Sequence, residues 1–283
     1  MPPPPARRRP LATLWAPAAR WSEHLCMFVV RDTRGCELAD HEQLNRYPAN
    51  PYCSITWLLE GQSRLVAQGD SARAEVLPRH FVNGCQTRPV VSRNLGERHS
   101  FCVVFHPDAF RALFGVDLAA IQDAFVDASQ VLPAHGVQLV DAVAAAGDDA
   151  ERRDIVDAFL AGHATPLGTS PWMRLRRMGV NVGLQLAGRL LGVGPRQVQR
   201  LARREAGLSV PGLSRLWRSE RSMRRVRETL ARGQAIDWAA HAVDAGYADQ
   251  SHLVRECKEF SGRTPARIVQ QARQDEADWF YRL

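Results

Sequence analysis

The chain has 283 residues, a length that suggests about two domains of ~100–200 residues each. Hydrophobic residues make up 45% and charged residues 24%, which is typical of a chain that buries a core, and no run of about 18 uncharged apolar residues is present to span a membrane. The six cysteines include no C-x-x-C pair, which excludes a zinc ribbon and a thioredoxin motif and favours the reducing cytoplasm.

Charge is divided unevenly along the chain. The net charge is +7, from 37 basic and 30 acidic residues. Residues 166–273 hold 20 basic and 8 acidic side chains, a net of +12, and the remainder holds 17 and 22, a net of −5. Lys258 is the only lysine, so almost every cation is an arginine, whose planar fork suits phosphates and base edges. This asymmetry favours a polyanion-binding segment in the second half of the chain.

The first twenty residues combine four prolines at positions 2–5, three arginines at 7–9 and an apolar stretch interrupted by Pro17. An apolar stretch this short and broken is a poor secretory signal. We therefore expect residues 1–20 to form a disordered tail.

Short runs rich in Val, Ile, Phe and Trp follow and predict strands at residues 25–30, 54–59 and 101–105. Helical patterns replace them, with Pro107 at a first turn and two more probable helices at 137–146 and 151–161. Strands first and helices later predict an α+β domain over residues 21–165 that is β-rich, with a cupin-like arrangement as one form of it.

A linker is expected around residues 163–170, and beyond it the chain is helical throughout. A short amphipathic helix at 184–191 stops at Gly192-Val193-Gly194, and a second helix at 195–206 carries Arg and Gln along its outer face. Two short helices joined by a tight glycine turn predict a helix-turn-helix.

The same pattern recurs after a long helix at 210–232. Residues 236–243 form another short helix, Ala245-Gly246-Tyr247 makes the turn, and Asp249 is a good N-cap for an outward-facing helix. A last short helix ends near Arg273, which predicts an all-α domain over residues 166–273 and a tail over 274–283.

The length of the connecting helix indicates how the two helix-turn-helix units could bind one duplex. About 23 residues at ~1.5 Å each span ~34 Å, and one turn of B-DNA is ~34–36 Å. Two recognition helices at the ends of such a spacer could enter successive major grooves on one face of a duplex.

The stretch from Asp244 to Leu253, continuing through Lys258, Gly262 and Pro265, resembles the second helix-turn-helix signature of the AraC/XylS family of bacterial transcription regulators. The first unit is similar to the family's first signature more loosely. Gly194 stands where the family usually has a serine cap, which predicts a less well nucleated helix. The front half, at 84–89 and 110–116, is similar to an uncharacterised N-terminal domain of many such regulators.

The resemblance implies which side chains meet DNA. Those implied to contact base edges are Arg196, Gln199 and Arg200 from the first recognition helix and Gln250, Ser251, His252 and Arg255 from the second. Arginine can bind guanine and glutamine can bind adenine through paired hydrogen bonds. Those better placed for phosphates, which fix position without reading sequence, are Arg203, Arg204, Lys258 and Arg263.

Catalytic chemistry has little support. The seven histidines of the front half include no H-x-H, H-E-x-x-H or H-x-x-x-H spacing, and neither G-x-S-x-G nor a phosphate loop is present. We expect no catalytic residue, metal or cofactor. The alternative left open is a small-molecule-binding or metal-dependent cupin-like enzyme with an accessory helical domain.

The sequence therefore predicts a cytoplasmic, sequence-specific transcription regulator that is not an enzyme and binds double-stranded DNA. Its front domain is expected to sense an effector or to mediate dimerisation. Further partners left open are RNA polymerase, a small-molecule effector of unknown identity and a second copy of the chain; no membrane association is expected.

Overall fold

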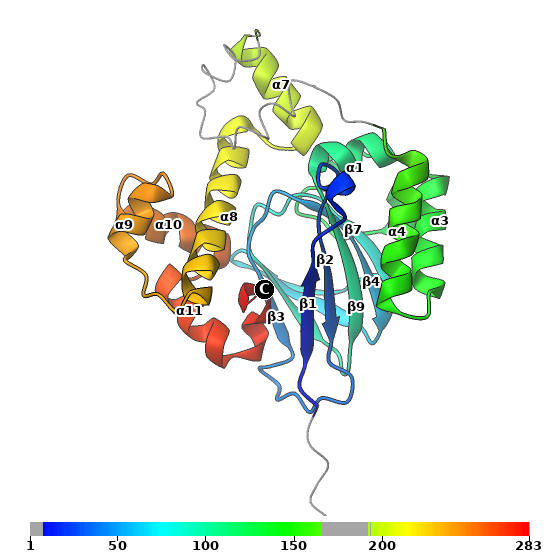
Figure 1. Ribbon diagram of the computed structural model, residues 1–283, viewed down its shortest axis with the longest axis horizontal. Helices are drawn as coiled ribbons and strands as arrows, with labels where there is room; N and C mark the ends of the chain where they lie inside the picture. Colours follow the sequence, from blue (N-terminus) through cyan, green and yellow to red (C-terminus); the bar gives the residue numbers. More distant parts are fainter. Residues whose placement is uncertain (1–7, 166–191, 193, 283) are drawn as a thin grey trace, which may run out of the picture.

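The N-terminal region consists of two antiparallel sheets (Figure 1). The structure is a computed structural model, which describes residues 8–165, 192 and 194–282. The larger sheet has the strand order β1-β2-β9-β4-β7-β10 and the smaller one β3-β8-β5-β6. In chain order the strands are β1 (Leu11–Trp15), β2 (Leu25–Asp32), β3 (Leu44–Tyr47), β4 (Cys53–Glu60), β5 (Ser63–Gln68), β6 (Ser71–Val76), β7 (His80–Asn83), β8 (Val90–Asn94), β9 (His99–Phe105) and β10 (Val126–Asp127).

Along the central strands of the larger sheet, successive side chains point to opposite faces. One face of the sheet packs into the hydrophobic core and the other lines a cavity. One set of side chains, including Phe28, Trp57 and Phe101, packs into the main hydrophobic core with the helices that follow. Their neighbours in sequence, such as Val29 and Thr56, line a cavity on the opposite face. Because successive side chains of a strand point to opposite faces, a single register fixes both surfaces.

Helices cover the core face of the larger sheet (Figure 1). They are α1 (Pro107–Phe114), α2 (Ala128–Val131), α3 (Ala134–Ala145) and α4 (Asp149–His163), with a short 3-10 turn, η1 (Ala19–Trp21), ahead of β2. Trp57 ties sheet to helix, since its indole N–H donates to the carbonyl of Val140 at 2.9 Å. The expected β-rich region followed by helices is confirmed.

The expected disordered start is wrong for part of its length. Residues 11–15 form the edge strand β1, paired with β2 from Leu11 opposite Asp32 to Trp15 opposite Phe28. Trp15 packs against the main core, and the guanidinium of Arg153 lies 4.7 Å from its ring centroid. A five-residue strand beside a proline-rich, arginine-rich stretch gives little sequence signal, and its order comes from pairing with β2. Residues 1–7 lie outside the described part.

The C-terminal region is helical, as expected. It contains α7 (Pro195–Ala206), α8 (Val210–Ala231), α9 (Trp238–Asp244), α10 (Gln250–Ser261) and α11 (Pro265–Gln274). Gly246 makes the turn between α9 and α10 at a φ of +84°, a conformation that favours glycine. The expected helix at 184–191 and most of the expected linker lie outside the described residues.

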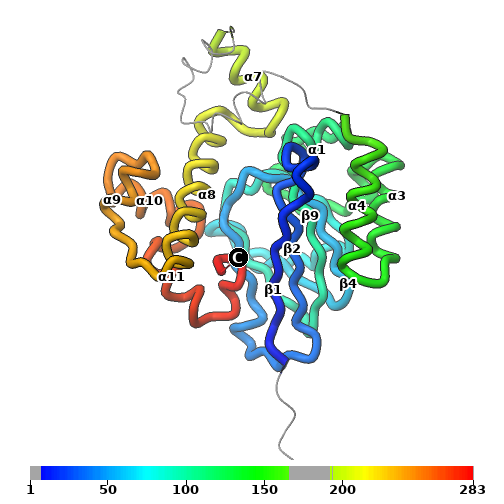
Figure 2. The backbone as a smooth tube through the Cα atoms, viewed as in Figure 1, coloured from blue at the N-terminus to red at the C-terminus, as the bar shows by residue number. Residues whose placement is uncertain are grey.

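The last residues also fold. The expected tail at 274–283 instead contains the 3-10 helix η2 (Glu276–Arg282), with Ala277, Asp278, Trp279 and Tyr281 buried. Figure 2 shows this red end of the chain between the helical region and the sheets, where it packs on β3 and α11. Three aromatic residues in sequence, at 279–281, are the signal for a packed segment that the tail prediction missed.

Candidate nucleic-acid interface and internal cavity

The outer face of α7 gathers four of the predicted DNA-contacting residues. Arg196, Arg200 and Arg203 are exposed and line one shallow hollow together with Gln199. Gln199 is half-buried, and its side-chain oxygen accepts the backbone N–H of Val210 at 3.2 Å. Its amide therefore joins α7 to the start of α8, while the three arginines face outward.

The two predicted recognition helices, α7 and α10, differ at their N-termini. Gly194 provides no side-chain cap for α7, and weaker nucleation of this helix stays a prediction. Asp249 caps α10, as predicted, by accepting the backbone N–H of His252 at 2.6 Å. The second helix is therefore fixed at its start by a bond that the first one lacks.

The outer face of α10 carries the second predicted set. Gln250, Ser251 and Arg255 are exposed. His252 is half-buried: its Nδ1 accepts the backbone N–H of Ala248 at 3.3 Å, and its Nε2 lies 3.4 Å from a carboxylate oxygen of Glu256. Its ring is thus already engaged with neighbours in the turn and on the same helix.

A buried carboxylate, which no sequence pattern indicated, fixes α10 to the connecting helix. Glu256 accepts Nε of Arg215 at 3.0 Å and a terminal nitrogen of Arg218 at 2.5 Å, and both arginines lie on α8. Arg218 also stacks over the ring of Tyr247 in the turn, 4.8 Å from its centroid. These arginines set the position of the second recognition helix relative to the spacer.

The predicted phosphate contacts fall into two groups. Arg203, Arg204 and Lys258 are exposed. Arg263 instead points inward, where its guanidinium donates to both carboxylate oxygens of Asp278 at 2.6 and 2.7 Å. In this structure Arg263 is held by the C-terminal segment.

Residues of the N-terminal region contact the C-terminal end of α7. Arg111 of α1 donates twice to Glu205, at 3.1 Å each, and Glu205 is only 7% exposed. The thiol of Cys85 donates to the carbonyl of Ala206. A Cβ on Gly207 would lie 2.9 Å from the carbonyl oxygen of Leu118, so glycine permits this close approach. These partners are far apart in sequence, which is why sequence patterns did not reveal them.

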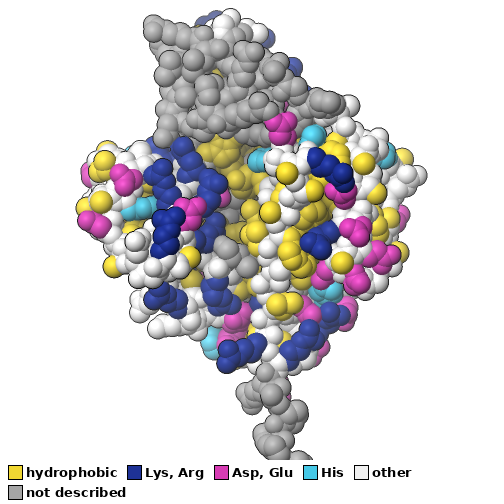
Figure 3. All heavy atoms as spheres, in the orientation of Figure 1, with side chains coloured by type: hydrophobic (Ala, Val, Ile, Leu, Met, Phe, Trp, Pro, Cys, Tyr) yellow, Lys and Arg dark blue, Asp and Glu magenta, His cyan; other side chains and the backbone are white. Residues whose placement is uncertain are grey.

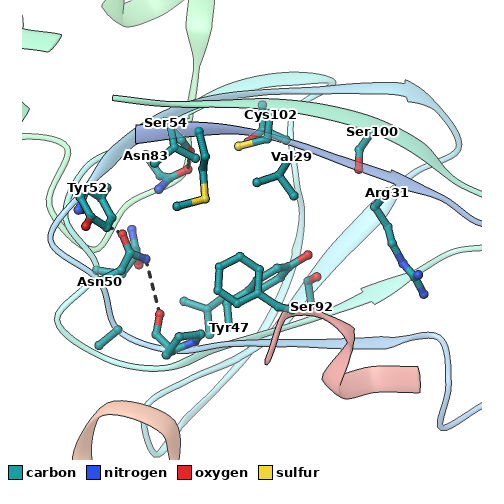
Figure 4. A pocket seen from close by; sticks show the side chains of 18 of the residues that line it. Val29, Arg31, Tyr47, Asn50, Tyr52, Ser54, Asn83, Ser92, Ser100 and Cys102 are labelled. Carbon is teal, nitrogen blue, oxygen red and sulfur yellow. Dashed lines mark hydrogen bonds between the residues drawn. The ribbon is translucent and has the colours of Figure 1, made fainter. Parts of the chain in front are cut away.

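The two sheets enclose a cavity of about 200 Å³ (Figure 4). Apolar side chains from β2, β7, β8 and β9 form much of its lining: Met27, Val29, Phe81, Val90 and Val104. Hydrogen-bonding side chains are interspersed, including Ser54, whose hydroxyl donates to Asn83 at 2.6 Å. Residues of α8 and the aromatic residues of η2 close the cavity on the side of the helical region.

Two buried arginines line this cavity. Arg31, 1% exposed, donates to Glu276 at 2.6 Å, but its Nε and second terminal nitrogen have no hydrogen-bond partner. Arg98, 6% exposed, donates to the neutral oxygens of Asn94, Ser63 and Ser100, and no carboxylate pairs with it within the described ranges. Burial lowers the pKa of Arg31, and Glu276 opposes that shift. One carboxylate for two buried guanidinium groups leaves unsatisfied positive charge.

The surface around the connecting helix is basic. In Figure 3, dark-blue side chains gather over α8, and hydrophobic side chains lie beside them toward the N-terminal region. Among the residues that the structure describes, no three His, Cys, Asp or Glu side chains lie together as metal ligands. None of the described helices is long and apolar enough to cross a bilayer.

Comparison with known proteins agrees with the helical geometry. The family model of a helix-turn-helix domain matches residues 187–271. No curated protein matches the chain in sequence.

Several solved structures are similar at low identity. Apo ToxT K231A from Vibrio cholerae has 13% identity and a TM-score of 0.48, over 86% of this chain and 97% of that one. The AraC-like activator CuxR has 12% identity and a TM-score of 0.26 over 82% of this chain and 91% of that one. The iron(II) form of HppE has 16% identity and a TM-score of 0.27, and the match covers only 34% of this chain and 50% of that one.

The family match covers both recognition helices and the spacer between them. It thereby includes all the predicted base-contacting residues. The chain thus carries a region that matches the model of a helix-turn-helix domain, residues 187–271, behind a β-rich N-terminal region.

Proposed function

We propose that the chain regulates transcription by inserting α7 and α10 into successive major grooves of one DNA duplex. The observation that carries this proposal is the pair of helices with exposed polar side chains, α7 directly before the long helix α8 in the chain and α10 after it. At ~1.5 Å per residue, the 22 residues of α8 span ~33 Å, close to one turn of B-DNA. A domain boundary near residue 165 fits this division of labour.

Selection of duplexes from a random library by the full-length chain tests the proposal. We expect two conserved half-sites about 10 base pairs apart in the selected DNA. Fluorescence anisotropy on the selected duplex is expected to show affinity that falls steeply with salt, because arginines displace counterions from phosphates. Recovery of unrelated sequences, with equal affinity for every duplex, would refute sequence-specific regulation.

We further propose that the N-terminal region senses an effector within the cavity. The lining supports a small apolar molecule that carries a hydrogen-bond-accepting, anionic group. Apolar side chains would bury its body, and the unpartnered nitrogens of Arg31 and Arg98 would meet its charge.

A matched pair of probes tests this sensing role. Octanoate and 1-octanol share an apolar chain and differ in charge, so isothermal titration should show the tighter binding for octanoate. Arg98→Met is expected to remove that difference by weakening octanoate at least tenfold and leaving 1-octanol unchanged. A bulky Val104→Trp substitution, which fills the cavity, is expected to abolish both. Equal binding of the two probes by the unchanged protein would refute an anion site.

The cavity favours sensing over the other role considered for this region, dimerisation. A homodimer and contact with RNA polymerase remain compatible with the proposal. The bacterial cytoplasm, where promoter DNA and polymerase are found, is the proposed location.

A further inference from the structure

The C-terminal segment, residues 275–282, belongs to the wall of the cavity. Trp279, Phe280 and Tyr281 line it. Arg31 is paired with Glu276 and stacks over Trp279, 5.0 Å from the ring centroid. The indole N–H of Trp279 also donates to Asn45 of β3 at 2.8 Å. Anything that enters the cavity therefore meets this segment.

The same segment holds the second helix-turn-helix unit. Asp278 is 0% exposed, and its two carboxylate oxygens accept from Arg263, which follows α10. Arg46 of β3 contributes to the same cluster, 3.0 Å from Asp275 and 3.3 Å from Asp278. One carboxylate thus joins the N-terminal region to the end of the recognition helix.

We propose that this C-terminal segment is a latch that withholds Arg263 from DNA until the cavity is occupied. The inference rests on the proposed DNA-binding function and adds a mechanism of regulation to it. Both terminal nitrogens of Arg263 donate to Asp278, one of them also donates to Gln271 at 2.8 Å, and its Nε is buried. When the latch opens, the guanidinium group of Arg263 leaves the carboxylate of Asp278 and binds a phosphate of the DNA instead.

The cavity and Arg263 are coupled because the residues that contact each of them are neighbours in the C-terminal segment. Glu276, which holds Arg31 in the cavity, lies two residues before Asp278, and Trp279 follows directly. An occupant that competes with Glu276 for Arg31, or displaces the aromatic side chains, must move the backbone that carries Asp278. Arg263 is freed by that movement.

Asp278→Asn in the full chain tests the latch by removing the charge that holds Arg263. One added phosphate contact steepens the slope of log K against log salt by about 0.9, which corresponds to roughly eightfold tighter binding at 0.1 M monovalent salt. We expect a five- to tenfold gain in affinity for the selected duplex by anisotropy. In an Arg263→Gln background the same change is expected to give no gain.

A control separates release of Arg263 from a simple loss of negative charge. Glu259→Gln removes an exposed carboxylate of α10 that pairs with Arg215, and its effect should be the same with or without Arg263. Glu276→Gln leaves Asp278 intact and loosens the latch from the cavity side, so a smaller gain is expected. This variant keeps the test available if Asp278→Asn does not fold.

The outcomes distinguish the two proposals. Unchanged or weaker binding by folded Asp278→Asn and Glu276→Gln variants would overturn the latch, as would a gain that persists without Arg263. If the unchanged protein binds no duplex from the library, the proposed function fails and the latch fails with it.

Discussion

At the scale of single residues, the arginines of α7 differ in what their side chains already touch. Arg200 is exposed on the face that also carries Arg196 and Arg203. Arg204 is exposed too, but its Nε donates to Glu205 at 2.7 Å. Within residues 8–165 and 194–282, no contact ties Arg200 to a carboxylate. A guanidinium group in that state can read a base edge, whereas one held by a carboxylate is suited to a positional contact with phosphate.

Arg200→Ala and Arg204→Ala should therefore have different effects. Loss of Arg200 is expected to cost about 1–3 kcal/mol on the selected duplex and to relax preference at one base pair. Loss of Arg204 is expected to weaken binding evenly across sequences and to reduce the salt slope by about 1. Anisotropy with the selected duplex and single-base variants of it checks both. Identical profiles for the two variants would contradict the assignment of roles.

His241 of α9 predicts a pH dependence of stability. Burial, assisted by the nearby charge of Arg225, lowers the pKa of this histidine below its ordinary value, and Asp244 opposes the shift. The unfolded chain then binds a proton more readily than the folded one, so the free energy of unfolding falls as pH drops through about 6.5.

Urea denaturation between pH 7.5 and 5.5 measures this loss. His241→Gln, which keeps a hydrogen-bonding group near Ser222, is expected to lose less stability over that range. His80, whose pKa burial also lowers, contributes in the same direction, so part of the loss should remain. The same pH dependence in both proteins would argue against a role for His241.

At the scale of elements, capping distinguishes the two recognition helices. The sequence predicted this difference because capping depends on one residue at the start of a helix. Asp249 supplies a side-chain acceptor and Gly194 does not. Helix propensity along α8 was local in the same way, and its predicted bounds agree with Val210–Ala231 within one residue. The strand β1 was missed because an edge strand owes its order to a partner elsewhere in the chain.

Asp249→Ala should destabilise the chain by about 1 kcal/mol, because the N–H of His252 loses its acceptor. Chemical denaturation checks this value. Gly194→Ser is expected to act in the opposite direction by only a few tenths of a kcal/mol, since the site is extended and open around a new Cβ. A destabilising Gly194→Ser would show that capping does not limit α7.

At the scale of the whole molecule, contacts with the N-terminal region hold both helix-turn-helix units. Arg111 donates two hydrogen bonds to Glu205 at the end of α7. The backbone N–H of Ala49 donates to the carbonyl of Phe260 at the end of α10. Ala49 and Cys85 also share a hydrophobic cluster with α7 and α8. The helices predicted to bind DNA are therefore positioned by the N-terminal region as well as by each other.

Arg111→Met should weaken this docking by about 1–3 kcal/mol, because the buried Glu205 loses its paired donor. Denaturation and limited proteolysis of the full chain check it, with faster cleavage expected. Arg204→Gln alters a more exposed partner of the same carboxylate and is expected to change stability far less. Equal losses from the two variants would contradict a docking role for Arg111.

The sequence by itself determined the helical C-terminal region, its repeated helix-turn-helix pattern, the length of the spacer and the outward arginines, since each depends on residues near one another along the chain. It also indicated sheets followed by helices in the N-terminal region. Only the tertiary structure decided that Arg263 is held by Asp278, that Arg31 and Arg98 face one cavity and that the C-terminal residues close it. These features depend on side chains brought together from distant segments, and no local pattern encodes which distant partner a buried charge will meet.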